Sequence, residues 1–169
     1  MDILWTPWRI EYILGAKQPG CVFCQAIHAA PEGDAARLLL YRGEHCFVIM
    51  NLYPYNTGHL MVVPYLHTSD LVTLAPEIMA ELGDLTRRAV ALLKATLKPE
   101  GFNLGMNLGR VAGAGIDDHL HQHIVPRWGG DTNYMPVLAE TRTMPELLPD
   151  TYAKLMSGIA EFFPPAKAK

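Results

Sequence analysis

The sequence predicts an α+β domain in which helices pack on an antiparallel sheet. Three observations indicate this class: short apolar runs between turn residues, one long amphipathic pattern, and a second helical pattern near the C-terminus. Their order is strands, a long helix, strands and a final helix, as in α+β domains. The 169 residues fit one domain. We expect it to span residues 1–163, followed by a polar tail at 164–169.

Three antiparallel strands are expected in the first half of the chain. They follow an N-terminal segment, residues 1–30, that holds a Cys-x-x-Cys sequence and a short helix near 25–30. Turn residues at 42–44 and 54–58 separate the apolar runs. The expected strands are Leu38–Tyr41, Cys46–Asn51 and Leu60–Pro64.

A long helix is predicted from Pro76 to about Leu97. A proline is favourable at its start, and Pro99 and Gly101 end the pattern. Apolar side chains recur every three or four positions and therefore share one face: Ile78, Leu82, Leu85, Ala89, Leu93 and Leu97.

The second half of the chain is expected to add two strands and a closing helix. A glycine-rich segment, residues 109–115, joins the two strands, and the chain is irregular from Pro126 to about Pro149. The expected elements are the strands Phe102–Leu108 and His119–Val125 and the helix Thr151–Phe162.

Composition and charge exclude several classes of protein. The formal net charge is −3 and no basic cluster is present, so a long nucleic-acid partner is not expected. No run of about 18 apolar residues predicts a membrane helix, and the N-terminus lacks the pattern of a secretion signal. We therefore expect a cytoplasmic protein. A polyanionic small molecule remains possible, because histidines and backbone N–H groups bind phosphate.

Three histidines alternate along the run from His119 through His121 to His123. Because side chains alternate faces along a strand, these imidazoles should emerge on one side, about 6.5–7 Å apart. Buried polar groups need partners, so three rings on one face indicate a functional site. A metal centre in the triad is the main chemical competitor, since two histidines two apart on a strand can hold one zinc ion.

The segment His119-Leu120-His121-Gln122-His123-Ile124-Val125 resembles the His-x-His-x-His-φ-φ signature of the histidine-triad (HIT) superfamily. Within it, the chain is similar to the bacterial diadenosine tetraphosphate phosphorylases, also described as ATP adenylyltransferases. The resemblance covers nearly the whole chain and implies a HIT-like sheet, extended by homodimerisation. Further stretches that carry it are residues 4–9, 51–64 and 125–131.

The resemblance implies a role for each histidine of the site. His121 would be the nucleophile that attacks the α-phosphorus, with its other ring nitrogen hydrogen-bonded to a main-chain carbonyl near His119. His123 would lie beside the transferred phosphate. His59 matches an accessory histidine that orients the triad, although a solvated turn histidine is the alternative.

Nucleotide contacts are expected beside the triad. Gly113 and Gly115 would let the backbone approach a phosphate. Many relatives carry Ser, Thr or Gln three or four residues before the first histidine, where this chain has Gly115 and Ile116. That departure leaves the phosphate contact to main-chain amides or to Asn107, while Asn51 matches the position that reaches the ribose hydroxyls.

Cys21 and Cys24 indicate metal or redox chemistry, or simply two buried thiols. Their resemblance to metal-binding HIT proteins adds His67 and His119. Two thiolates and two imidazoles form a closed ligand set, which suits structural zinc. Cys46 is expected to be a small core residue.

The resemblance implies an enzyme that converts diadenosine tetraphosphate and phosphate to ATP and ADP through a nucleotidyl-histidine intermediate. The first alternative uses water, as a hydrolase of dinucleoside polyphosphates or nucleoside phosphoramidates. The second is a nucleotide-binding sensor without turnover, an alternative that the missing polar residue before the triad suggests.

Overall fold

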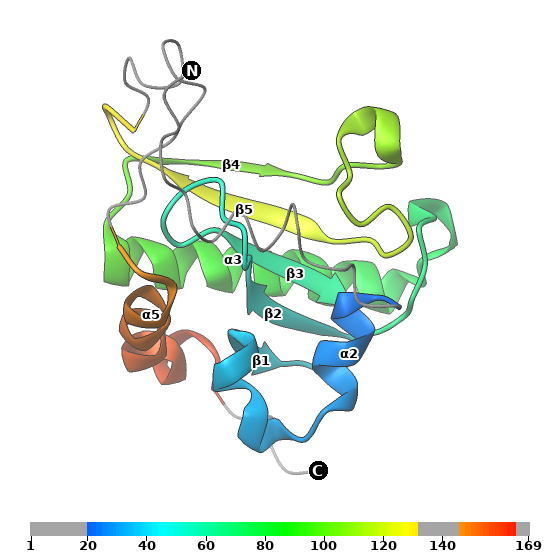
Figure 1. The fold of residues 1–169 in the computed structure, drawn as a ribbon, viewed down its shortest axis with the longest axis horizontal. Coiled ribbons are helices and arrows are strands. Elements are labelled where there is room, and N and C mark those ends of the chain that lie inside the picture. Colours follow the sequence, from blue (N-terminus) through cyan, green and yellow to red (C-terminus); the bar gives the residue numbers. More distant parts are fainter. Residues whose placement is uncertain (1–19, 132–145, 165–169) are drawn as a thin grey trace, which may run out of the picture.

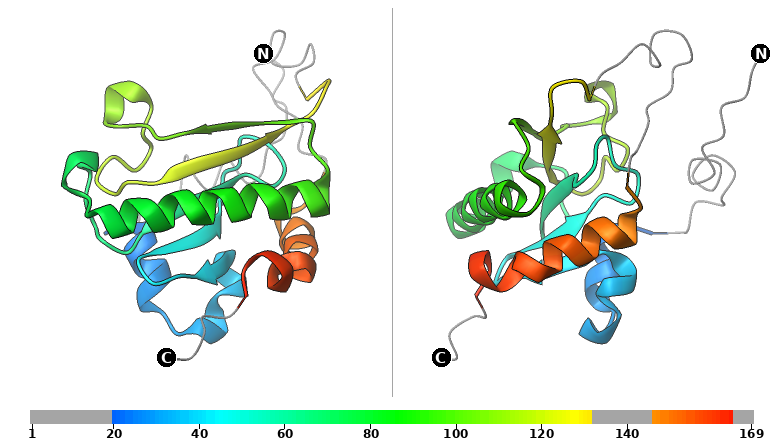
Figure 2. Two further views of the ribbon diagram at one scale, coloured as in Figure 1. Left: turned by 180° about the vertical axis from the view of Figure 1, so that it is seen from behind. Right: turned by 90° about the vertical axis from the view of Figure 1, so that its left-hand side faces the viewer.

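The structure is a computed structural model that describes residues 20–131 and 146–164. The similar stretch at residues 4–9 and most of the polar tail lie outside these ranges. A five-stranded antiparallel sheet forms the centre, with helices on both of its faces (Figures 1 and 2). Within the described part, no helix is both long and apolar enough to cross a membrane.

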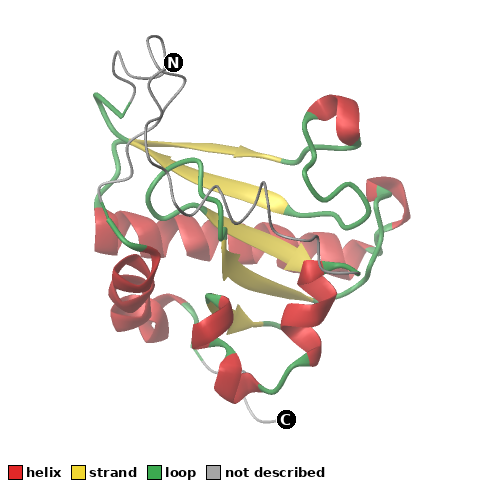
Figure 3. Ribbon diagram, in the orientation of Figure 1, coloured by secondary structure: helices red, strands yellow, loops and turns green. Residues whose placement is uncertain are grey.

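The sheet has the strand order β1-β2-β3-β5-β4, and every neighbouring pair is antiparallel (Figure 3). Short 3-10 turns interrupt the loops, including one at Arg110–Ala112 in the glycine-rich segment. The helices and strands are α2 (Val22–His28), β1 (Leu39–Arg42), β2 (Cys46–Met50), β3 (Leu60–Pro64), α3 (Pro76–Leu97), β4 (Gly101–Gly105), β5 (Gln122–Arg127) and α5 (Leu148–Phe162).

Strands β2 and β3 are buried on both faces, because α3 covers one face and α2 the other. On the α3 side, alternate strand residues pack against the predicted helix face, with Leu82, Leu85, Ala89 and Leu93 buried. On the other side, Phe23 and Ala26 of α2 pack on the core residues Phe47, Ile49, Met61 and Val63. Helix α5 contacts α3 and β1.

Most elements lie where the sequence predicts them. Strand β3 and helix α3 have the predicted bounds, and β1 and β2 differ by one residue at their ends. Helix α2 begins at Val22, three residues early, so Cys21 is its N-cap residue. Helix α5 also begins three residues early, because Pro149 is tolerated in a first turn, where its nitrogen has no helical acceptor.

Larger differences affect three strand bounds, and two of them concern the site. Strand β5 continues to Arg127, two residues beyond its predicted end at Val125, so Pro126 lies in a strand and not in an irregular segment. Strand β4 ends at Gly105 rather than Leu108, and β5 begins at Gln122 rather than His119. Pairing with β4 ends at the Gly105–His123 pair, so the chain before Gln122 has no strand partner on that side. The Leu120 N–H instead donates to the Thr68 carbonyl. His119 and His121 therefore precede the strand, and only His123 lies in it.

Candidate active site and metal centre

Four buried histidines form a row of rings where the segment before β5 meets α2 and the turn before β3. The ring centroids of His121 and His123 are 4.7 Å apart, and those of His123 and His59 are 5.1 Å apart. His119 lies at the other end, linked to His121 through the Phe23 ring that contacts both. The three triad rings thus gather at one site although no regular strand carries the first two.

Among the described residues, only one of the two ring nitrogens of His121 has a hydrogen-bond partner. Its Nδ1 lies 2.9 Å from the carbonyl oxygen of His119. A carbonyl only accepts, so Nδ1 carries the hydrogen and donates it, and Nε2 keeps its lone pair. Burial lowers the pKa of His121, which keeps the ring neutral near pH 7. A neutral imidazole whose second nitrogen keeps its lone pair is the nucleophilic form.

A second chain of hydrogen bonds sets the tautomer of His123. The Tyr55 N–H donates to Nδ1 of His59 at 3.0 Å, so the hydrogen of His59 sits on Nε2. That nitrogen lies 2.9 Å from Nδ1 of His123, which therefore accepts and leaves a hydrogen on its own Nε2. Burial and the neighbouring histidines lower the pKa of His59 to about 3 and that of His123 to about 4. Both rings are neutral at pH 7, and His123 is a hydrogen-bond donor.

The turn before β3 holds His59 in place. Gly58 has φ +74°, a conformation that favours glycine, and a Cβ there would lie 2.5 Å from Cδ1 of Leu97, so that the leucine side chain would have to move. Asn51 lies beside the same ring, with its Nδ2 3.4 Å from Nδ1 of His59. His59 is therefore buried and hydrogen-bonded, not a solvated turn residue.

The glycine-rich segment, which precedes the triad in the sequence, is held by contacts between its own residues and those that flank it. Nδ2 of Asn107 donates to the Gly113 carbonyl at 3.3 Å, and Gly113 adopts φ +91°. Arg110 and Asp117 form an ion pair across the segment at 2.6 Å, and Gly115 is exposed. The predicted phosphate contacts of Asn107, Gly113 and Gly115 stay predictions.

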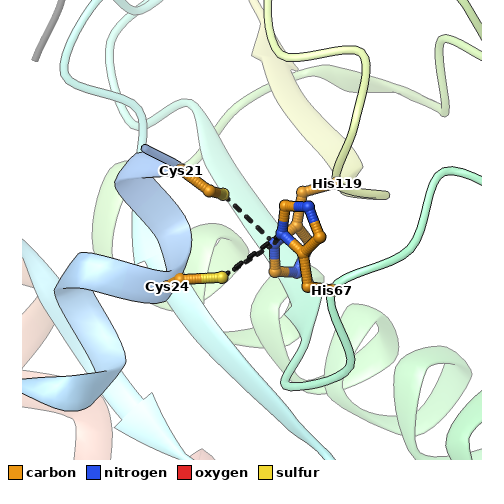
Figure 4. Close-up of side chains that lie close together, drawn as sticks. All are labelled: Cys21, Cys24, His67 and His119. Atoms are coloured by element: carbon orange, nitrogen blue, oxygen red, sulfur yellow. Dashed lines mark hydrogen bonds between the residues drawn. The ribbon is translucent and has the colours of Figure 1, made fainter. Parts of the chain in front are cut away.

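Cys21, Cys24, His67 and His119 form a compact cluster in which all four potential ligand atoms lie within 4.8 Å of one another (Figure 4). Nδ1 of His119 lies 3.3 Å from Sγ of Cys21, 3.7 Å from Sγ of Cys24 and 3.2 Å from Nδ1 of His67. Tetrahedral zinc with these ligands requires ligand–ligand distances of roughly 3.3–3.8 Å. The donor set and its spacing therefore fit zinc.

The surroundings also orient both imidazoles toward this cluster. Nε2 of His119 donates to the Pro64 carbonyl at 2.9 Å, which leaves the lone pair of Nδ1 for a metal. Nε2 of His67 lies 3.7 Å from a carboxylate oxygen of Asp118. Burial and the nearby Cys21 thiol raise the pKa of Cys24. Since two negative thiolates at this spacing repel each other, both can be deprotonated together only with a cation between them.

Cys46 is separate from this cluster. It is fully buried among the side chains beneath α3, and burial raises the pKa of its thiol to about 12. It lies in the core, as the sequence predicts, and its protonated thiol is a poor ligand.

Sequence reasoning missed three contributors to the site. Phe23 contacts two triad rings, Tyr55 sets the tautomer of His59 through its backbone, and Asp118 faces His67. The position of Phe23 between the two cysteines is a signal that could have identified it. The other two contacts depend on how loops fold back, which spacing does not reveal.

Comparison with known proteins settles the family. The HIT domain family matches residues 32–130. The chain belongs to the histidine-triad family. An "AP-4-A phosphorylase" of Mycobacterium tuberculosis is 42% identical over 154 residues, which cover 88% of this chain and 79% of that protein.

Solved structures of HIT proteins share the fold. A Zn-bound histidine triad family protein from Mycobacterium smegmatis superposes with a TM-score of 0.66 at 29% identity, over 84% of this chain and 94% of that one. A hypothetical histidine triad nucleotide-binding protein from Sulfolobus tokodaii has a TM-score of 0.63 at 26% identity, over 88% of this chain and 100% of that one.

Proposed function

We propose that this HIT protein cleaves dinucleoside polyphosphates by nucleotidyl transfer, converting diadenosine tetraphosphate and phosphate to ATP and ADP. The observation that carries the proposal is the tautomer of His121: its Nδ1–H donates to the His119 carbonyl, so Nε2 keeps its lone pair beside the ring of His123. The identity of 42% to a mycobacterial AP-4-A phosphorylase supports the substrate class and the acceptor.

In the first step, Nε2 of His121 attacks the α-phosphorus of one adenosine. A P–N bond forms, the P–O bond to the remaining phosphates breaks, and ATP leaves. In the second step, a phosphate oxygen attacks the same phosphorus, the P–N bond breaks and ADP leaves. Covalent catalysis divides one difficult displacement into two easier ones, and the imidazole returns to its starting form.

His123 and His59 have distinct parts in this mechanism. The hydrogen on Nε2 of His123 is donated to an oxygen of the transferred phosphate or of the leaving group. His59 supports that role through its 2.9 Å contact with Nδ1 of His123 and its neutral state. His59 is therefore a positioning residue.

The remaining predicted contacts complete the site. We propose that either main-chain amides at Gly113 and Gly115 or the amide of Asn107 bind phosphate oxygens, and that Asn51 binds the ribose. Zinc held by the Cys-x-x-Cys pair with His67 and His119 is structural, because four protein ligands leave no open position for substrate.

The deciding experiment supplies diadenosine tetraphosphate with and without ¹⁸O-labelled phosphate and identifies the products. We expect ADP that carries the label, and no sustained turnover without phosphate. AMP and ATP formed at the same rate without phosphate would reject phosphorolysis in favour of hydrolysis. His121→Ala is the control for contaminating activity.

Two alternatives remain as outcomes of the same assay. Water is a second candidate acceptor, because the tautomers of His121 and His123 suit attack by either oxygen nucleophile; nucleoside phosphoramidates are then also tested as substrates. A non-catalytic sensor would bind AMP and leave every substrate unchanged. This alternative is based on Gly115 and Ile116, which stand where many relatives have a polar residue.

A further inference from the structure

We propose that Phe23 is a positioning residue for His121 and that it couples the metal cluster to the nucleophile. The proposal rests on the proposed function for its kinetic consequence, while its structural part concerns the orientation of the His121 ring alone. The proposal is based on one buried aromatic ring. Phe23 lies between Cys21 and Cys24 in the sequence, and its ring contacts both His119, a candidate metal ligand, and His121, the proposed nucleophile.

The Phe23 ring lies 5.0 Å from the His121 ring and 5.4 Å from the His119 ring, measured between centroids. Phe23 is 2% exposed, whereas its neighbour Val22 on α2 is 49% exposed. Helix α2 thus directs Phe23 inward at the triad. The Phe47 ring lies farther away, with its centroid 6.5 Å from that of Phe23.

The position of α2 depends on contacts at its two ends. At seven residues it is too short to be stable alone, and its N-cap residue makes no side-chain capping bond. At the C-terminal end, the Arg42 guanidinium donates to two helix carbonyls, to the carbonyl of the C-cap residue Ala29 and to Asp34. At the N-terminal end, Cys21 and Cys24 meet His67 and His119 in the cluster. Metal binding there would fix the end of the helix that carries Phe23.

The orientation of His121 requires such packing. Among the described residues its ring has one hydrogen bond, to the His119 carbonyl, which restricts rotation about the Cβ–Cγ bond. Because a hydrogen bond tolerates N–H···O angles from 180° down to about 150°, this contact alone still allows a range of ring orientations. Two rings limit the rotation: Phe23, tilted by 48°, and His123, nearly perpendicular at 78°. A displacement of about 1 Å at a reacting atom can cost roughly a hundredfold in rate. The ring of Phe23, together with that of His123, therefore narrows the range of directions in which Nε2 can point.

The first test needs neither substrate nor activity. Two-bond ¹H–¹⁵N spectra of the imidazoles are recorded for the zinc-loaded protein and after removal of zinc by a chelator, with circular dichroism to confirm that the fold persists. We expect the His121 ring signals to shift or broaden, those of His59 to stay unchanged, and the change at His121 to be smaller in Phe23→Leu. A change of the same size in Phe23→Leu would assign the coupling to the His119 carbonyl and overturn the role of Phe23. Unchanged His121 signals, or equal changes at both rings, would overturn the coupling.

The second test compares Phe23→Leu with Phe47→Leu as a matched core variant. Phe47 is buried beside Phe23 and stacks on Tyr65, and no histidine ring contact is found for it among the described residues. We expect Phe23→Leu to lower kcat about tenfold, to change KM less than twofold and to keep one zinc per chain. Phe47→Leu should lower stability with kcat retained. Equal losses of kcat in both variants would contradict a positioning role.

These two tests separate the inference from the proposed function. If no dinucleotide is turned over, the kinetic arm does not apply, yet the spectra of His121 still decide whether the metal site fixes its ring. If turnover occurs and the spectra show no coupling, the function stands and the role of Phe23 is rejected.

Discussion

At the scale of single residues, main-chain groups decide which nitrogen of each site histidine carries the hydrogen. The carbonyls of Pro64 and His119 accept from two rings, and the N–H of Tyr55 donates to a third. Because these groups cannot change role, the lone pair of His119 is on Nδ1, at the Cys-His cluster, and that of His121 is on Nε2, as the proposed mechanism requires. The different tautomers of His119 and His121 thus follow from the main-chain groups that lie beside each ring.

Replacing His59 tests the hydrogen-bond chain that ends at His123. His59→Gln removes the ring that donates to Nδ1 of His123, so the hydrogen of His123 is no longer confined to Nε2. We expect kcat to fall about tenfold to a hundredfold with KM little changed, measured by steady-state assay. The exposed His28 is the matched control. His28→Gln should retain full activity. An unaffected kcat in His59→Gln would contradict the role of the hydrogen bond between His59 and His123.

The same pair predicts how stability depends on pH. Burial lowers the pKa of His59 from 6.5 to about 3 and that of His123 to about 4. Between these values and 6.5, the unfolded chain binds protons that the folded chain does not, so stability falls as pH decreases from about 6.5 to 4. Urea denaturation at several pH values should show this slope. His59→Gln should reduce the slope relative to the parent protein, and an identical slope would contradict the assignment.

At the scale of elements, the pattern of apolar residues predicts those helix and strand bounds that the local sequence determines. Helix α3 has its predicted bounds because a proline begins it and Pro99 and Gly101 follow it. The start of β5 could not be predicted in this way. Alternation continues back to His119, but the pairing ends at Gly105, a limit that depends on the neighbouring strand.

The candidate site was predictable to a similar degree. The spacing of the histidines and cysteines, read with the family resemblance, identifies the two clusters that the structure brings together. It does not reveal that α2 docks with Phe23 against His121, since that contact depends on packing between segments about a hundred residues apart. The sheet gathers the residues, and loops and α2 orient them.

Metal removal tests the role of α2 as an element held by its cysteines. Chelation should lower the melting temperature by several degrees, because a ligand that binds only the folded state stabilises it. Cys24→Ser should melt at a lower temperature and should no longer respond to the chelator. Cys46→Ala is the matched control: its thiol lies in the core, so the variant should keep its response. A chelator response retained in Cys24→Ser would contradict the ligand set.

At the scale of the whole molecule, we predict a homodimer whose two sheets join, as the HIT resemblance implies. Strand β4 is an edge of the sheet, and its outer residues, among them Leu104 at 52% exposure, are open to solvent. Sedimentation equilibrium should give twice the chain mass of 18.8 kDa. Leu104→Asp should give the monomer mass if β4 forms the joint. A dimer that withstands this change would place the interface elsewhere.

The most direct test of the account is to trap the intermediate. The protein is mixed with diadenosine tetraphosphate in the absence of phosphate, quenched within seconds under alkaline denaturing conditions that preserve phosphoramidates, and digested for mass spectrometry. The account predicts an adenylyl group on the peptide that contains His121, located on that residue by fragmentation and lost when phosphate is added before quenching. No adduct on His121, together with full turnover by His121→Ala, would contradict it.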